Sequence, residues 1–352
     1  MALYPKLILD ALEKVRYPGN GKNLVEAEMV DDNIRIDGNK VSFSLIFDKP
    51  TDPFIRSVVK SAEAAVKMYV GKEVEIEGNI SVVSRQALRP EVGKFLPQVK
   101  NVIAISSGKG GVGKSTVTAN LAVALAKEGY KVGVLDADIY GPSQSKMFGV
   151  EDYLPDAKQV DGRDYIVPAE VDGIKIISIA MFIRKTDALL WRGTMANSAL
   201  RQLIHKTEWG YLDFLLIDLP PGTGDIHLSI INELRIGGAI IVSTPQQVAV
   251  ADVVRGVEMF RNPNVNIPVL GVVENMAWFT PAELPNNRYY IFGKGGAARY
   301  AEEVGVDLLG EVPIIQDIMQ GADDGTPAVN THPQVAEIYR QVAQKVVDKM
   351  GK

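Results

Sequence analysis

Seven short apolar runs, separated by segments with helical patterning, dominate the chain from residue 101 to residue 312. Each run is continuous rather than alternating, which is typical of strands buried on both faces. The pattern predicts an α/β fold in residues 101–352, with a mostly parallel sheet and helices on both faces. The expected strands are residues 102–106, 131–136, 174–180, 214–219, 239–244, 269–274 and 308–312.

Residues 1–80 follow a different pattern, which predicts a separate small α+β domain. Amphipathic helices are expected at 3–15 and 53–69, and strands at 33–36, 41–47 and 73–80. This α-β-β-α-β unit can close a small core of its own. Residues 81–100 show little periodicity, so we interpret them as a linker to the larger domain of residues 101–352.

A glycine-rich segment follows the first strand of the larger domain and matches the phosphate-loop pattern G-x-x-x-x-G-K-[ST]. A strand before it and a helix after it are the context that this motif requires. Glycines let backbone N–H groups turn toward a phosphate, and the helix N-terminus adds partial positive charge. We therefore predict that Lys114 reaches the outer phosphates of ATP and that the Ser115 hydroxyl binds Mg²⁺. The predicted ATP-binding residues are Gly108, Lys109, Gly110, Gly111, Val112, Gly113, Lys114, Ser115 and Thr116.

Aspartates end two other predicted strands, at the edge where ligands of parallel sheets bind. Asp136 and Asp138 are two residues apart, so they face the same side near a strand end. Asp218 ends a continuous apolar strand, which is the Walker B pattern. Carboxylates beside Mg²⁺ and a phosphate can hold the metal's waters and orient an attacking water. The sequence therefore predicts an ATPase whose metal site contains Ser115, Asp136 and Asp218.

Lys109 places a second lysine directly after the first glycine of the loop. The resulting form, G-K-G-G-x-G-K-[ST], resembles the deviant P-loop of the MinD, ParA, Mrp and nitrogenase-reductase group. The resemblance implies a homodimer in which Lys109 reaches across the interface to the partner's nucleotide. It makes Lys109 a candidate catalytic residue.

Longer strings resemble one branch of this group, the Mrp/ApbC-type P-loop ATPases, a family of iron–sulfur cluster carriers. They are residues 136–143 (D-x-D-x-x-G-P-S), 191–193, 218–225 (D-L-P-P-G-T-G-D), 243–246 and 274–276. The order of elements in residues 1–80 is similar to the small assembly-factor domain that precedes many of these ATPases. The resemblance implies slow ATP hydrolysis, with Asp138 orienting the water and Asn275 contacting the adenine base. It also implies assembly proteins or apo-protein clients as partners.

The chain departs from this family in its cysteines, of which it has none. Many members carry Cys-x-x-Cys in the segment that corresponds to residues 277–289 here, and two such pairs would hold an iron–sulfur cluster between protomers. The small domain usually has a Cys-Pro pair where this chain has Asp52-Pro53. Cluster irons need thiolate or imidazole ligands, and the three histidines are scattered. We therefore expect MgATP binding without a stable cluster on this chain's own ligands.

Charge and hydropathy limit the partners and the location. A net charge of −5 does not favour a nucleic-acid surface, and no apolar run approaches the length of a transmembrane helix. Residues 1–14 lack the apolar core of a signal peptide, so we expect a cytoplasmic protein without nucleic-acid or membrane partners.

Two alternative functions stay open. One is a MinD/ParA-like positioning ATPase, although the last helix, expected at 331–350, has mixed charge rather than the basic face of a membrane-binding helix. The other is an ATP-gated dimeric module that recruits partners without cluster chemistry.

Overall fold

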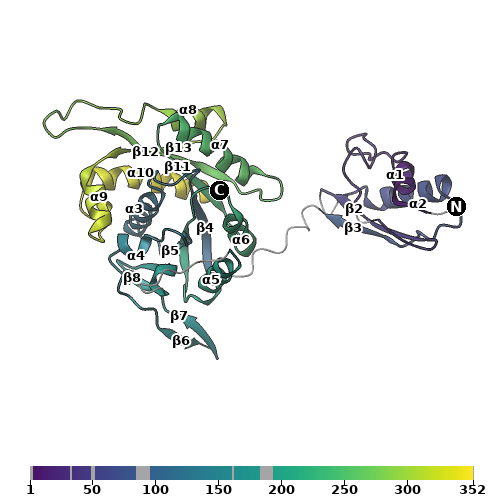
Figure 1. The fold of residues 1–352 in the computed structure, drawn as a ribbon, viewed down its shortest axis with the longest axis horizontal. Helices are drawn as coiled ribbons and strands as arrows, with labels where there is room; N and C mark the ends of the chain where they lie inside the picture. The colour runs from purple at the N-terminus through teal and green to yellow at the C-terminus, as the bar shows by residue number, and fades with distance from the viewer. Residues whose placement is uncertain are drawn as a thin grey trace. The chain divides into compact units, whose positions relative to one another are not determined.

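The computed structural model of the chain describes residues 3–31, 34–48, 52–84, 96–160, 162–182 and 193–351. The chain divides into two compact units, residues 1–91 and 92–352 (Figure 1). Most of the predicted linker, residues 85–95, lies outside the described residues. The larger unit contains a mostly parallel sheet with helices, so the predicted fold class is confirmed.

The N-terminal unit has a three-stranded sheet and two helices. Its elements are α1 (Pro5–Leu12), β1 (Arg35–Asp37), β2 (Lys40–Phe47), α2 (Ile55–Tyr69) and β3 (Ile80–Ser84). The central strand, β2, pairs antiparallel with β1 and parallel with β3. Alternate residues of β2 are buried, and they pack with apolar residues of both helices in a core that belongs to this unit alone.

The last strand of this unit begins where the prediction ended it. Val74 and Ile76 are buried, as expected for the predicted strand at 73–80. The backbone turns here instead, because Gly78 has a φ of 74° and the Asn79 N–H donates to the Ile76 carbonyl. The predicted position was therefore wrong, and the paired strand is β3, which extends into the predicted linker.

The larger unit is built on an eight-stranded sheet in the order β13-β12-β11-β4-β10-β5-β9-β8. Neighbouring strands are parallel except for β8 and β9. The strands are β4 (Val99–Ser106), β5 (Val132–Asp136), β8 (Ala169–Val171), β9 (Ile174–Ser178), β10 (Leu212–Asp218), β11 (Gly238–Ser243), β12 (Val269–Phe279) and β13 (Leu308–Ile314). The prediction missed β8 and the separate hairpin of β6 (Ala157–Val160) and β7 (Arg163–Ile166), because these short strands have no continuous apolar run.

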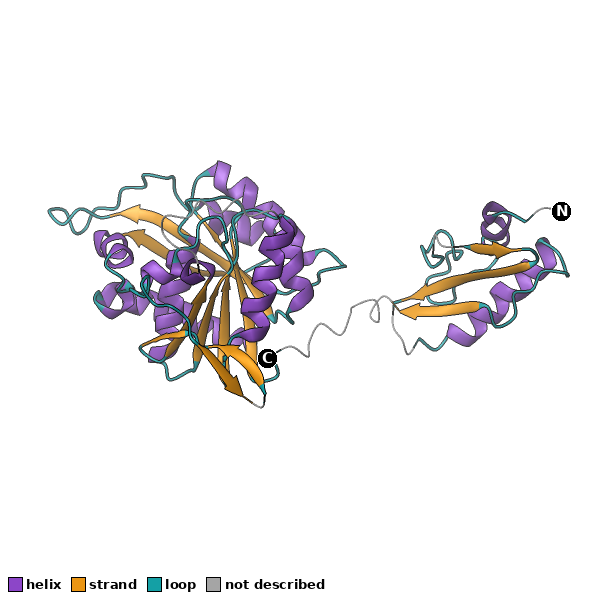
Figure 2. Ribbon diagram, turned by 60° about the horizontal axis from the view of Figure 1, so that its bottom comes forward, coloured by secondary structure: helices purple, strands orange, loops and turns teal. Residues whose placement is uncertain are grey.

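Helices cover both faces of this sheet. They are α3 (Lys114–Lys127), α4 (Gln144–Met147), α5 (Gly193–Lys206), α6 (Asp225–Glu233), α7 (Gln247–Arg261), α8 (Gly296–Glu303), α9 (Gln316–Asp323) and α10 (Pro333–Met350), with 3₁₀ turns at Ile179–Phe182 and Ala328–Asn330. Figure 1 shows α3, α4, α9 and α10 on one side of the sheet and α5, α6 and α7 on the other, and Figure 2 shows the strands fanned out between the helices.

The last helix, α10, packs on its own unit. It buries Val335, Tyr339, Val342 and Val346, and its nearest elements are α3 and β13. Its apolar face is therefore already covered. Within the described ranges, no helix combines the length and the hydropathy needed to cross a membrane.

Candidate nucleotide-binding site

The glycine-rich loop connects β4 to α3 at the carboxyl edge of the sheet. Gly113, which caps α3, has a φ of 83°, and an added Cβ would lie 2.1 Å from Asn275 Nδ2. A side chain at this position would be strained and would clash, so the turn requires glycine. The loop lines a cavity of about 220 Å³ together with Asp138, Met147 and Pro221.

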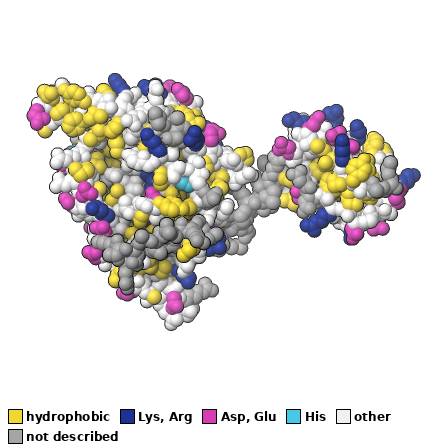
Figure 3. All heavy atoms as spheres, in the orientation of Figure 1, with side chains coloured by type: hydrophobic (Ala, Val, Ile, Leu, Met, Phe, Trp, Pro, Cys, Tyr) yellow, Lys and Arg dark blue, Asp and Glu magenta, His cyan; other side chains and the backbone are white. Residues whose placement is uncertain are grey.

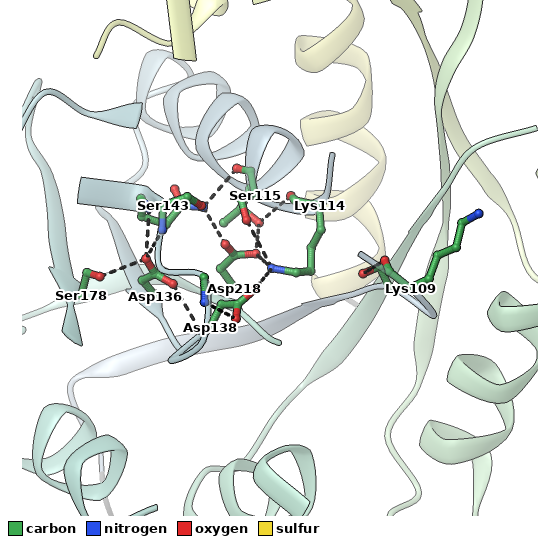
Figure 4. Close-up of polar contacts among 12 residues, drawn as sticks. Lys109, Lys114, Ser115, Asp136, Asp138, Ser143, Ser178 and Asp218 are labelled. Carbon is green, nitrogen blue, oxygen red and sulfur yellow. Dashed lines mark hydrogen bonds and ion pairs between the residues drawn. The ribbon is translucent and has the colours of Figure 1, made fainter. Parts of the chain in front are cut away.

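Lys114 lies at the floor of this cavity with three oxygen groups around its amine (Figure 4). Its Nζ atom is 2.5 Å from Asp218 Oδ1, 3.8 Å from Asp138 Oδ2 and 3.3 Å from Ser115 Oγ. The strand register explains why these residues lie together. Strand β10 lies between β4, which leads into the loop, and β5, so that Asp218 is placed opposite Asp136. The structure thus brings together four of the residues that the sequence predicts for the site.

Two residues that the sequence analysis missed complete the surroundings of Asp218. Thr118 Oγ1 donates to Asp218 Oδ1 at 3.1 Å, and Gln144 Nε2 donates to Oδ2 at 2.8 Å. Gln144 Nε2 also lies 3.0 Å from the Ser115 carbonyl oxygen. A sequence signal existed for both residues. Thr118 lies one helical turn after Lys114, and Gln144 directly follows the D-x-D-x-x-G-P-S string.

Asp136 is wholly buried beside this group and organises the turn after β5. Its Oδ2 atom accepts from the N–H groups of Ser143 and Gln144 and from the Ser178 hydroxyl, each at 3.0 Å. Burial raises the pKa of Asp136, and the charge of Asp218 raises it further. The carboxylate is thus engaged by the protein's own donors, and its predicted metal contact stays a prediction.

The turn that Asp136 holds places Asp138 at the wall of the cavity. Asp138 Oδ1 accepts from the Gly141 N–H at 3.2 Å, while Oδ2 faces Lys114. Burial raises the pKa of Asp138, and the positive charge of Lys114 opposes this effect. The side chain is 11% exposed, so it can reach a small molecule in the cavity without being freely solvated.

The second lysine of the loop, Lys109, lies differently. Its side chain extends away from the group around Lys114 (Figure 4). Its carbonyl oxygen accepts from the Ser107 hydroxyl at 3.0 Å, which fixes the backbone but not the amine. Lys109 thus lines the same cavity, but its amine takes no part in the group around Lys114.

Asn275 touches the loop from β12. Its amide nitrogen donates to the Val112 carbonyl at 2.9 Å, and the side chain is buried. The next residue, Met276, has a φ of 56°, a strained left-handed conformation at which the pairing of β12 with β13 becomes irregular. The observed contact supports the loop, and the predicted contact to adenine stays a prediction.

Glu274, the neighbour of Asn275, holds the start of α8. Its Oε2 atom accepts from the N–H groups of Ala297 at 2.7 Å and Ala298 at 3.2 Å. Burial raises its pKa. The glycine-rich residues 292–296 are therefore a turn before a helix rather than a second phosphate loop.

The segment at the family's Cys-x-x-Cys position forms a surface hairpin, which we define as residues 279–291. Phe279 and Tyr289 exchange two backbone hydrogen bonds of 2.8 Å, and Arg288 stacks on Trp278 with 4.2 Å between the guanidinium carbon and the ring centre. Figure 3 shows apolar side chains gathered at the upper left of the larger unit, where this hairpin lies. Its exposed apolar residues are Phe279, Leu284, Tyr289, Tyr290 and Ile291.

Within the described ranges, no three His, Cys, Asp or Glu side chains form a group that could hold a metal ion. Trp191 and Arg192, which belong to a family-like string, lie outside the described residues.

Comparison with known families decides the affiliation. Residues 98–347 match the family described as NUBPL iron-transfer P-loop NTPase. The chain belongs to this NTPase family. Residues 6–77 match a second family, the iron–sulfur cluster assembly proteins. The resemblance seen in the sequence strings is therefore confirmed for both parts of this NTPase.

Curated relatives and solved structures agree with this affiliation. An iron–sulfur cluster carrier protein of Synechocystis sp. is 42% identical over 348 residues, covering 96% of this NTPase and 97% of the relative. One of Aquifex aeolicus is 48% identical over 255 residues, covering 71% and 68%. Among structures, a nucleotide-binding protein from Archaeoglobus fulgidus in complex with ADP is 37% identical, with a TM-score of 0.60 over 71% of this NTPase and 96% of that chain. The Pyrococcus furiosus cell division ATPase MinD is 26% identical, with a TM-score of 0.51 over 70% and 98%.

Proposed function

We propose that this NTPase binds and hydrolyses MgATP as a homodimer and serves iron–sulfur cluster assembly in the cytoplasm. The observation that carries the proposal is the position of Lys114 beneath the loop, within reach of Asp218, Asp138 and Ser115. A buried lysine among hard oxygen donors is the arrangement that phosphate and Mg²⁺ require. The ADP named for the Archaeoglobus protein supports a nucleotide in the same loop.

The residues present fit Mg²⁺. The Ser115 hydroxyl and the Asp218 carboxylate are the oxygen ligands that this ion prefers, directly or through water. When bound, Mg²⁺ would neutralise phosphate charge. Lys114, which now pairs with Asp218, would then turn its amine to the outer phosphates. Thr118 and Gln144 would keep the Asp218 carboxylate oriented through the hydrogen bonds they already make.

Hydrolysis needs a group that orients water and a cation that stabilises developing charge. Asp138 suits the first role, because its carboxylate faces the cavity and is held by the Gly141 N–H. Lys109 suits the second role from a partner protomer, because its side chain extends away from Lys114 and the aspartates around it (Figure 4). These two placements support the proposed homodimer.

An iron–sulfur cluster would be the cargo of this protein, and the side chains of this chain do not suit it as ligands. The sequence has no thiol, and carboxylates are too hard to hold a sulfide-bridged cluster tightly. We therefore propose that assembly proteins or apo-protein clients supply the cluster ligands. The carrier names of the Synechocystis and Aquifex relatives support this role in assembly.

A second candidate function is an ATP-gated recruitment module without cluster chemistry. The surface hairpin favours it, because exposed aromatic and aliphatic residues occupy the place of the family's cysteine pair. Exposed apolar clusters of this kind suit protein contacts. A MinD-like positioning role has less support, because α10 packs on its own unit.

Phosphate release from MgATP by the purified full chain tests the proposal. We expect slow turnover by the wild type and none by Lys114→Ala. Lys158→Ala, which removes an exposed lysine paired with Glu208, serves as the control and should keep wild-type turnover. Turnover that survives in Lys114→Ala would contradict the proposed ATPase. So would a wild-type chain that releases no phosphate from MgATP.

A further inference from the structure

His227 is a buried histidine that the proposed mechanism does not use. It lies in the first turn of α6, and its side chain is 1% exposed. Its backbone N–H donates to the Gly224 carbonyl at 3.0 Å. Neither ring nitrogen has a hydrogen-bond partner among the described residues. Two unpaired polar atoms in a buried place are uncommon, and each raises the free energy of the state that contains them.

The surroundings of this ring favour its neutral form. Burial lowers the pKa of His227. Backbone groups of Pro220 and Gly224 lie close enough to the ring to oppose this effect, although neither contact has full hydrogen-bond geometry. A neutral imidazole has one donor and one acceptor nitrogen. The ring can therefore donate one hydrogen bond and accept another, and no described residue meets either nitrogen with full hydrogen-bond geometry.

The backbone nearest the ring belongs to the loop that follows Asp218, which we call the Pro-Pro loop, residues 219–224. Pro221 lines the cavity of the phosphate loop, and the Gly222 N–H donates to the Ser107 carbonyl at 2.8 Å. Pro220 and Pro221 have no N–H of their own, so they cannot anchor the loop by donating hydrogen bonds. The loop thus touches the cavity on one side and the imidazole on the other.

We propose that His227 is a positioning residue for this loop. With a nucleoside triphosphate in the cavity, the Gly222 N–H leaves Ser107 and turns to the outermost phosphate. The same movement brings the Pro220 carbonyl into hydrogen-bond geometry with the imidazole N–H. The bond to His227 then holds the loop in the hydrolytic arrangement. This inference rests on the proposed ATPase function and names a residue on which that function depends.

Two substitutions separate a positioning role from a structural one. His227→Gln keeps a donor and an acceptor, whereas His227→Leu keeps the volume and removes both. We expect kcat for MgATP to fall about tenfold or more in His227→Leu with KM changed less than about twofold, while His227→Gln keeps at least about half of the wild-type kcat. The melting temperature of His227→Leu should not fall, since it removes unpaired polar atoms from a buried place.

Several results would overturn the inference. A His227→Leu enzyme with wild-type kcat excludes a positioning role, and an equal loss in His227→Gln shows that packing rather than hydrogen bonding matters. A wild type without turnover would instead defeat the proposed ATPase function.

Nitrogen-15 NMR of the histidine rings tests the same bond without activity. The chain has three histidines, so the His227→Gln spectrum assigns the signal. A ring-nitrogen shift of His227 with Mg²⁺ and a non-hydrolysable ATP analogue, but not with ADP, is expected. No shift with the bound analogue, or the same shift with ADP, would contradict the inference.

Discussion

Lys114 Nζ lies 2.5 Å from Asp218 Oδ1, and the two side chains are 6% and 0% exposed. The pair joins the phosphate loop to the end of β10 across 104 residues of sequence. A lysine in this position already neutralises the carboxylate that we propose as a metal ligand. The protein therefore keeps its buried charges paired before any phosphate enters.

Breaking this pair should destabilise the nucleotide-free protein. We expect Lys114→Met to lower the free energy of unfolding of the larger unit by about 3 to 5 kcal/mol, because it leaves a buried carboxylate without its cation. The double variant Lys114→Met/Asp218→Asn should recover part of the loss, since it removes the orphaned charge as well. Chemical denaturation of the two single variants, Lys114→Met and Asp218→Asn, and of the double variant measures the coupling. Additive losses in the double variant would show that the two side chains are not energetically coupled.

Asp138→Asn should lower kcat more than it lowers MgATP affinity. Orienting the attacking water matters chiefly in the transition state, whereas the phosphates are held by the loop. Titration calorimetry with MgATP and single-turnover hydrolysis separate the two effects. An equal loss of nucleotide binding would instead assign Asp138 to metal ligation or to the fold of the turn after β5.

The purified chain, incubated without oxygen with ferrous iron and sulfide, should retain no stable cluster after desalting. No thiolate is available in the sequence, and the histidines at 205, 227 and 332 lie in unrelated segments. MgATP binding by the same sample should stay normal, which serves as the control for folding. A brown protein with stoichiometric iron and sulfide would show that this chain carries a cluster on ligands of its own.

Tyr17→Phe should destabilise the N-terminal unit by about 1 kcal/mol at pH 8, because the Tyr17 hydroxyl donates to Asp52. This bond raises the pKa of Tyr17 to about 12. The folded-state pKa lies above the unfolded value, so the wild-type advantage is complete below about pH 10 and declines as the pH rises toward 12. Tyr4→Phe, at an exposed tyrosine, is the matched control and should change little. If the two substitutions lowered the free energy of unfolding equally, the Tyr17–Asp52 hydrogen bond would not contribute to stability.

The sequence was sufficient for much of the site because its motifs coincide with strand ends. The loop at Gly113-Lys114 and the acid at Asp218 each follow a continuous apolar run, so the parallel sheet brings them to one edge. The same reasoning could not find Gln144 or Thr118. Both residues lie beside the motifs, but their contacts with Asp218 span 74 and 100 residues and depend on side-chain direction, which the spacing of the motifs does not specify.

The misplaced strand in the N-terminal unit has a comparable cause. Val74 and Ile76 alternate as a strand would, but they flank Glu75, which forms only an isolated bridge with Lys40 before the chain turns at Gly78. The direction of Lys109 is likewise invisible to the motif, which specifies the residue and not where its amine points. The contact of Asn275 with Val112 could not be predicted either. It is made where the pairing of β12 with β13 becomes irregular, and the sequence does not indicate that irregularity.

The most direct test of the account mixes two inactive proteins, Lys109→Ala and Asp138→Ala. If Lys109 acts across a dimer interface, each mixed dimer has one site with both groups intact and one site with neither. An equal mixture should then recover about a quarter of wild-type turnover, because half of the dimers are mixed and each has one working site. Native mass spectrometry in MgATP confirms that mixed dimers form. No recovery despite mixed dimers, or a protein that stays monomeric with and without MgATP, would contradict the shared site.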